Sequence, residues 1–156
     1  MSNPFVLLSI IPDAANAILD GRKLYEYRRV PPRIMDGTRV VMYVSGTNHA
    51  IVGEFISGDP LRLPVERLLD QTIPFTPHPR ELIAGYFSGL EVGTALPVRD
   101  PLRYEKAIPY AELKMLWPGF LAPQNFRYIY PTEKSAQLYR LLSGLRADTS
   151  LQKTLF

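Results

Sequence analysis

The chain of 156 residues is 46% hydrophobic and 21% charged, which excludes a disordered chain and a membrane-embedded one. It has no cysteine, so disulfides and thiolate catalysis are excluded as well. The net charge of +3 fits a local basic patch that faces phosphate, and it equally fits an ordinary solvated surface. The length predicts a single domain over residues 1–156.

The N-terminal segment predicts a buried strand rather than a targeting signal. It has no charged start, and the apolar run at residues 6–11 is too short for a signal peptide or a transmembrane helix. A cytoplasmic protein without a membrane partner is therefore expected. A helix should follow over residues 12–20, because Pro12 suits a first helical position and Gly21 suits a helix end.

Residues 24–29 alternate between apolar and charged side chains, which predicts a half-buried strand. Tyr25 and Tyr27 should share one face of this strand, and Glu26 and Arg28 the other. Two prolines end the segment directly afterwards.

The rest of the chain predicts short strands and short helices in one α+β domain. Further strands are expected at residues 38–44, 50–56, 95–98, 103–108 and 126–130, and helices at 64–71, 79–87, 110–116 and about 132–145. The apolar residues of the second of these helices should face the core, and these are Leu82, Ile83, Tyr86 and Phe87. The tail after residue 145 is expected to be frayed. This pattern predicts a small curved antiparallel or mixed β-barrel decorated with short helices, with a core over about residues 5–130.

Several kinds of site are not supported by the sequence. Two histidines and no cysteine cannot supply the four ligands of a structural zinc site. The sequence has no glycine-rich phosphate loop and no nucleophile elbow. His49 and His78 both fall in expected loops, where a solvated or capping role is favoured over catalysis. Neither a metal nor a cofactor is therefore expected.

The informative segment is the turn and strand that carry Lys23, Glu26 and Arg28. A bulge in the turn would point Lys23 to the same side as the other two, which would form a cation–anion–cation group. Arg28 could then bind a phosphate or a base edge, and Glu26 could accept a hydrogen bond from an exocyclic amine. The alternative is a salt-bridged surface strand of little energetic weight.

The pattern Gly-x-Lys-x-x-Glu-x-Arg at residues 21–28, after a proline-led helix, resembles the signature of the ASCH domain family, whose fold is similar to the PUA barrel. Further segments resemble the same family, at residues 8–12, 50–55, 85–89 and 122–129. The resemblance covers roughly residues 5–130 and fits the stand-alone type found in bacteria, archaea and phages. Two positions depart from the pattern. Ile11 stands where many relatives have a lysine, and Glu26 stands where the amidohydrolase members have a threonine.

The resemblance implies a cleft that binds RNA or another nucleic acid, with a flipped or modified base as one form of the ligand and transcriptional regulation as one role. RNA is favoured over DNA. The residues predicted to form the nucleic-acid-binding site are Lys23, Glu26, Arg28, Arg29, Tyr43, Ser45, Thr47, Gln124, Asn125 and Arg127.

A second hypothesis is an enzyme, because a few ASCH members are hydrolases of acylated cytidine or ribonucleases. Lys23 would then be the base and Glu26 the proton carrier. A carboxylate beside Lys23 favours the charged ammonium, which suits a binding contact better than a general base. A third hypothesis is a protein-interaction domain, which a large exposed apolar patch would support.

Overall fold

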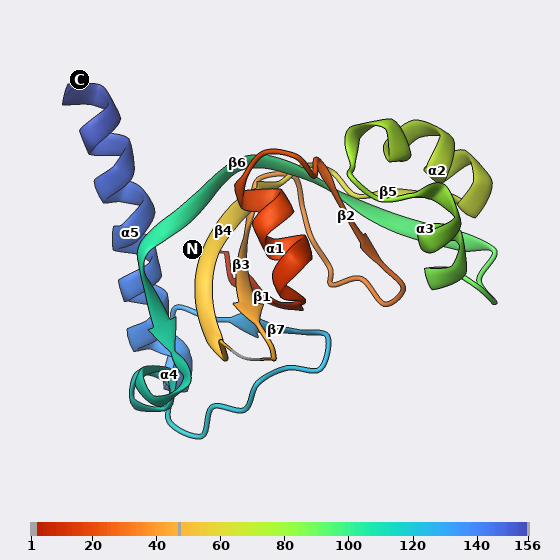
Figure 1. The fold of residues 1–156 in the computed structure, drawn as a ribbon. Helices are drawn as coiled ribbons and strands as arrows, with labels where there is room; N and C mark the ends of the chain where they lie inside the picture. The colour runs from red at the N-terminus through yellow and green to blue at the C-terminus, as the bar shows by residue number, and fades with distance from the viewer. Residues whose placement is uncertain (1–2, 47, 156) are drawn as a thin grey trace.

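The computed structural model describes residues 3–46 and 48–155, with 147–155 described by their backbone alone. Its strands form one strongly curled sheet that is flanked by helices (Figure 1). The strands are β1 (Phe5–Ile10), β2 (Tyr25–Arg28), β3 (Thr38–Val44), β4 (Ala50–Ser57), β5 (Leu61–Pro64), β6 (Val92–Pro109) and β7 (Phe126–Ile129). The helices are α1 (Pro12–Leu19), α2 (Val65–Thr72), α3 (Arg80–Tyr86), α4 (Tyr110–Leu116) and α5 (Ala136–Leu155). The predicted α+β class with a small curved sheet is therefore confirmed.

The sheet is mixed, with the order β2-β6-β4-β3-β1-β7, and β5 pairs with β6. The first strand, β1, runs parallel to β3 and antiparallel to β7, with Val6 opposite both Val40 and Tyr128. Since β1 has a neighbour on each side and helices lie over the curled sheet, its apolar run is buried almost throughout.

Alternate residues of β1 enter two separate cores. Leu7 packs with Val41 and with the buried side of α4 and α5. Val6 and Leu8 pack instead against α1, which lies in the hollow of the sheet (Figure 1). A third core holds α2 and α3 against β2 and β6, with Tyr27 and Phe87 among its members. This third core places α3 beside β2.

The long strand β6 replaces the two strands predicted at residues 95–98 and 103–108. It continues through Asp100, whose φ is 47°, and Pro101 because the ladder to β4 is interrupted there by a register shift. An irregularity of this kind accommodates residues that cannot join a regular ladder. Asp100 and Pro101, which are residue types typical of turns, therefore lie in a bulge within one strand. This strand also pairs with β2 and β5.

Helix α5 extends to Leu155, well beyond the predicted end near residue 145. Gly144 lies within the helix and does not end it, and Arg146 in the following turn is held by the sheet, since its Nε donates to Glu54 at 2.7 Å. Tertiary contacts thus override the local helix-ending signal. Within the described part of the chain, neither α5 nor another helix has the length and apolar character needed to cross a membrane.

The anchor of α5 is Glu54, a fully buried carboxylate on β4. Arg39 donates to its two oxygens at 2.8 and 2.5 Å, and Tyr104 donates at 2.6 Å. Burial alone would raise the pKa of Glu54, but the hydrogen bonds from Arg39 and Tyr104 outweigh it and lower the pKa. Since Arg39 also donates to the carbonyl of Leu142, at 2.6 Å, the ionised carboxylate connects β3, β4, β6 and α5.

Gly53 lies where β4 closely approaches β6. A Cβ atom at this position would lie 2.5 Å from the carbonyl oxygen of Leu102 and 2.9 Å from Cδ2 of Leu19. The substitution Gly53→Ala should therefore lower the free energy of unfolding by about 1–3 kcal/mol or more, measured by urea denaturation. Gly144→Ala is the matched control, because that Cβ meets nothing within 4 Å and alanine favours a helix, so stability should rise by about 0.5–1 kcal/mol. Equal effects of the two substitutions would contradict the close approach.

Candidate functional site: a charged cleft beside β2

The turn between α1 and β2 positions Lys23. Gly21 adopts the left-handed conformation with a φ of 80°. The backbone N–H groups of Arg22 and Lys23 both donate to the carbonyl oxygen of Ala17, at 2.9 and 3.0 Å. These bonds close the end of the helix and turn the Lys23 side chain into the protein, where the residue is 4% exposed.

The alternation of β2 decides which side chains join Lys23. Glu26 and Arg28 contact each other on one face of the strand, as the sequence predicted. Tyr27 leaves the strand on the other side, where its ring meets Phe87 edge-on at 5.9 Å and its hydroxyl donates to Thr72 at 2.7 Å. The aromatic residue therefore fixes β2 against the third core, and the charged residues remain on the face toward α1.

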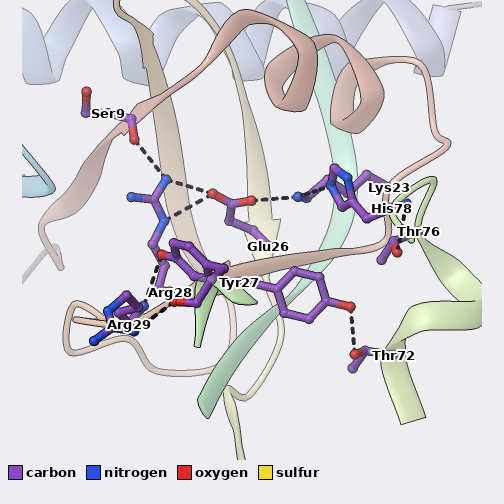
Figure 2. A network of polar contacts seen from close by, with 10 residues as sticks. Ser9, Lys23, Glu26, Tyr27, Arg28, Arg29, Thr72, Thr76 and His78 are labelled. Carbon is purple, nitrogen blue, oxygen red and sulfur yellow. Dashed lines mark hydrogen bonds and ion pairs between the residues drawn. The ribbon is translucent and has the colours of Figure 1, made fainter. Parts of the chain in front are cut away.

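Lys23, Glu26 and Arg28 form one ion-paired group, which we call the charged floor (Figure 2). The Lys23 Nζ atom lies 3.1 Å from Glu26 Oε1. Arg28 donates to Glu26 Oε2 through Nε at 3.1 Å and through Nη2 at 2.7 Å. The same Nη2 also donates to the backbone carbonyl of Ser9, at 2.8 Å, which ties β2 to β1. The three side chains are only 4%, 5% and 11% exposed, so removal of one partner would leave a buried charge unpaired.

Glu26 is an ionised carboxylate in this setting. Burial by itself would raise its pKa, because a charge is poorly solvated inside a protein. The ammonium of Lys23 and the guanidinium of Arg28 act in the opposite direction and lower the pKa of Glu26 below its ordinary value of 4.5. The floor therefore carries two cations and one anion.

His78 completes the group, and the sequence analysis did not place it there. Its Nε2 atom lies 2.7 Å from Lys23 Nζ. Since an ammonium has donors and no acceptor, Nε2 is the unprotonated nitrogen and the imidazole is neutral with its proton on Nδ1. Burial, and then the charge of Lys23, lower the pKa of His78, although Glu26 acts in the opposite direction. No local signal could have revealed a contact between residues 55 positions apart, although the flanking Pro77 and Pro79 indicate a stiff loop.

The charged floor lines a cavity of about 690 Å³. One wall is the end of β1 and the start of α1, with Ile11 and Ala14. The opposite wall is α3, with Leu82, Ile83 and Tyr86. The prediction that Leu82 and Tyr86 face the core is wrong, because they are 59% and 41% exposed and border this cavity instead. An apolar residue on a helix can face either a core or a cleft, and helical spacing does not distinguish the two.

Of the other predicted site residues, Asn125 lines the cavity together with the charged floor. Arg29 lies outside it and donates through Nη1 to the carbonyls of Tyr86 and Ser88, both at 2.8 Å. Tyr43 is 1% exposed within the core that contains Leu7, so its side chain does not reach the surface for contact with a ligand.

Three further predicted site residues, Ser45, Gln124 and Arg127, do not line the cavity. Ser45 is half-buried at the end of β3, and Gln124 is exposed in the loop before β7. Arg127 lies with its guanidinium 4.2 Å from the centre of the Trp117 ring and borders a separate hollow of about 740 Å³. Thr47 lies outside the described residues.

The described residues contain no cluster of three or more histidine, aspartate and glutamate side chains that could hold a metal ion.

Solved structures similar to this chain include the crystal structure of ASCH from Zymomonas mobilis, with a TM-score of 0.79 and 24% sequence identity over 87% of this chain and 94% of that one. Two mutant forms of that protein match with TM-scores of 0.80 and 0.77. The first is 23% identical over 90% of this chain and 98% of its own, and the second is 24% identical over 88% and 94%. No protein-family model matches the sequence, and neither does any curated protein.

The buried position of Glu26 gives a stability prediction. Replacing Glu26 with glutamine leaves Lys23 and Arg28 buried without an anion, so the free energy of unfolding should fall by roughly 3 kcal/mol or more, measured by urea denaturation. Glu66→Gln is the matched control, since Glu66 pairs with Arg80 at 2.7 Å but is 78% exposed. Its loss should be much smaller because water screens an exposed pair. Losses of similar size in the two variants would mean that the charged floor is solvated.

The contact between His78 and Lys23 predicts how His78 titrates. His78 should titrate below its ordinary pKa of 6.5 in an NMR pH titration, and Lys23→Met should raise that pKa by removing a neighbouring cation. As the pH falls, His78 therefore binds a proton at a higher pH in the unfolded chain than in the folded protein. The contribution of His78 to stability is therefore complete above pH 6.5 and is lost as the pH falls below that value.

The sequence has only two histidines, so the spectrum of His78→Gln assigns both resonances. A pKa of His78 at or above its ordinary value would contradict the contact with the Lys23 ammonium.

Proposed function

Because this chain has the fold of an ASCH domain, as its sequence resemblance indicated, we propose that it binds one nucleotide unit in the cleft above the charged floor, either free or as an unpaired base of a nucleic acid. One observation carries the proposal. Lys23, Glu26 and Arg28 meet on one side of a single cavity whose other side is apolar and aromatic. Such a combination offers polar groups that fix the orientation of a ligand and flat apolar surface that excludes water.

The size of the cleft supports a ligand of this kind. Its volume of about 690 Å³ lies within the range of roughly 300–1,000 Å³ that is usual for small-molecule sites. A flat base would lie between Ile11 and Ala14 on one side and Leu82 and Tyr86 on the other. Tyr86 offers an exposed ring on which a base can stack. RNA in preference to DNA, a role in transcriptional regulation and a cytoplasmic location are parts of this proposal that rest on the family resemblance.

Binding fits the site better than the alternative of hydrolysis. A proton carrier must gain and lose a proton near neutral pH, whereas the pKa of Glu26 is held below its ordinary value despite burial. Glu26 is also held by Lys23 and Arg28 at once, so a proton transfer to its carboxylate would leave two cations without an anionic partner. The ion pairs of the charged floor hold its three charges in a fixed arrangement, and recognition of a ligand requires such an arrangement.

The proposal is tested by titrating the protein with single-stranded RNA and DNA oligomers of about eight nucleotides at low and at physiological salt. Arg28→Met should weaken binding about tenfold or more by removing a donor of the floor. Tyr86→Ala should weaken binding by a similar factor, since a stacked base contributes roughly 1–3 kcal/mol. Tyr86 is the more informative position because it is more exposed than the ion-paired Arg28, so its truncation should affect folding less.

Met115→Ala is the matched control, because Met115 is a 78% exposed apolar residue on α4 that does not line the cleft. It should leave the affinity unchanged. If neither Arg28→Met nor Tyr86→Ala alters the affinity of a folded protein for either nucleic acid, the cleft is not the binding site.

A further inference from the structure

The only carboxylate in the charged floor has its oxygens occupied. Glu26 Oε1 faces the ammonium of Lys23, and Oε2 accepts both Nε and Nη2 of Arg28. Since these partners are themselves almost buried, they are not exchanged for water or ligand without breaking ion pairs inside the protein. These contacts take three of the roughly four lone-pair sites of the carboxylate. The remaining one lies on a side chain that is 5% exposed, which disfavours the hydrogen bond from an exocyclic amine that the sequence-based hypothesis gave to Glu26.

The groups of the floor that remain free are donors. Arg28 uses Nε and Nη2, and Figure 2 shows its third nitrogen, Nη1, without a contact to any of the residues drawn. Among the described residues no hydrogen-bond partner of Nη1 is found, so its two protons are available. Lys23 uses two of its three protons, one toward Glu26 and one toward His78. The floor thus offers the protons of a guanidinium nitrogen and of an ammonium.

The backbone beside the floor offers little to an incoming donor. The carbonyl oxygen of Ser9 accepts a hydrogen bond from Arg28, and that of Asn125 accepts one from the Ser9 N–H group at 3.0 Å. The carbonyl of Ile10 accepts the N–H of Ser45 at 3.3 Å. Side-chain acceptors among the described lining residues include the carboxylate of Glu81 and the amide of Asn125, and both residues are exposed. Apart from the half-buried hydroxyl of Ser9, which can donate as well as accept, the side-chain acceptors outside the floor therefore lie on exposed residues, whereas the floor presents mainly donors.

We infer that the floor recognises a base edge built of acceptors, so that the cleft selects uracil and guanine over cytosine and adenine. This inference rests on the proposed function. With the edge that faces the major groove in a duplex, guanine presents O6 and N7, and uracil presents O4, all of which accept hydrogen bonds. Cytosine and adenine present an exocyclic amine at the corresponding position. That amine would face a donor of the floor, either Arg28 Nη1 or Lys23 Nζ, and leave polar groups buried without partners.

A base suits the floor better than a phosphate does. The floor carries a net charge of only +1, because Glu26 neutralises one of its two cations. A phosphate placed there would approach the Glu26 carboxylate and lose its hydration between apolar walls, which include Ile11, Ala14 and Leu82. A flat neutral base needs only the free donors and gains contact with these walls. The phosphate of a nucleotide then lies toward the open side of the cleft.

The test compares uridine, guanosine, cytidine and adenosine 5′-monophosphates by isothermal titration with the unmodified protein, so it does not depend on a variant. All four ligands carry the same ribose and phosphate, and differences in affinity therefore report the base. The uridine and guanosine nucleotides should bind about tenfold or more tightly than the other two. Ribose 5-phosphate is the control for the phosphate and should bind more weakly than all four.

Two substitutions at Arg28 separate donor geometry from charge. Arg28→Met and Arg28→Lys should both remove the preference between bases, because lysine keeps the charge and loses the planar fork of donors. Arg33→Met is the matched control, since Arg33 is exposed and does not line the cleft, and it should leave the preference intact.

Equal affinity for the four nucleotides, or a preference for cytosine or adenine, would overturn this inference and leave the proposed function standing. So would ribose 5-phosphate binding as tightly as the uridine nucleotide and weakening in Arg28→Met, because the floor would then hold phosphate. If none of the four nucleotides binds and the oligomers do not bind either, the proposed function falls and this inference falls with it.

Discussion

A carboxylate buried in a sheet needs cations, and the position of those cations organises this protein. Glu26 on β2 is held by Lys23 and Arg28, and Glu54 on β4 is held by Arg39 and Arg146. Burial alone would raise the pKa of each carboxyl group, and the surrounding donors reverse that effect. A buried carboxylate therefore remains charged inside the sheet only while distant segments of the chain stay in place around it.

The two ionic groups have different surroundings and so serve different purposes. Glu54 has no exposed surface, and its partners connect β3, β6 and α5, so this group stabilises the fold. The group at Glu26 borders a cavity, and Arg28 Nη1 has no hydrogen-bond partner among the residues that the structure describes. The same chemistry is structural where it is enclosed and available to a ligand where it meets a cleft.

The cleft exists because three parts of the chain converge on it. The end of β1 and the start of α1 form one wall, β2 carries the floor, and α3 forms the other wall. Tyr27 and Phe87 belong to the core that holds α3 against β2, and the contact between His78 and Lys23 attaches the loop before α3 to the floor. Recognition in this cleft would depend on donors at its floor and apolar surface at its sides, an arrangement that limits which ligands can enter without leaving polar groups unpaired.

Local features of this site can be read from the sequence. Gly21 ends α1 in the left-handed conformation, the alternation of β2 separates Glu26 from Tyr27, and both follow from backbone preferences within a few residues. Only the tertiary structure decided that His78 meets Lys23 and that Leu82 faces a cleft. It also decided that β6 passes through Asp100 as one strand. These outcomes depend on which faces pack together across the chain, and the energy of such long-range packing is not contained in the pattern of any short segment.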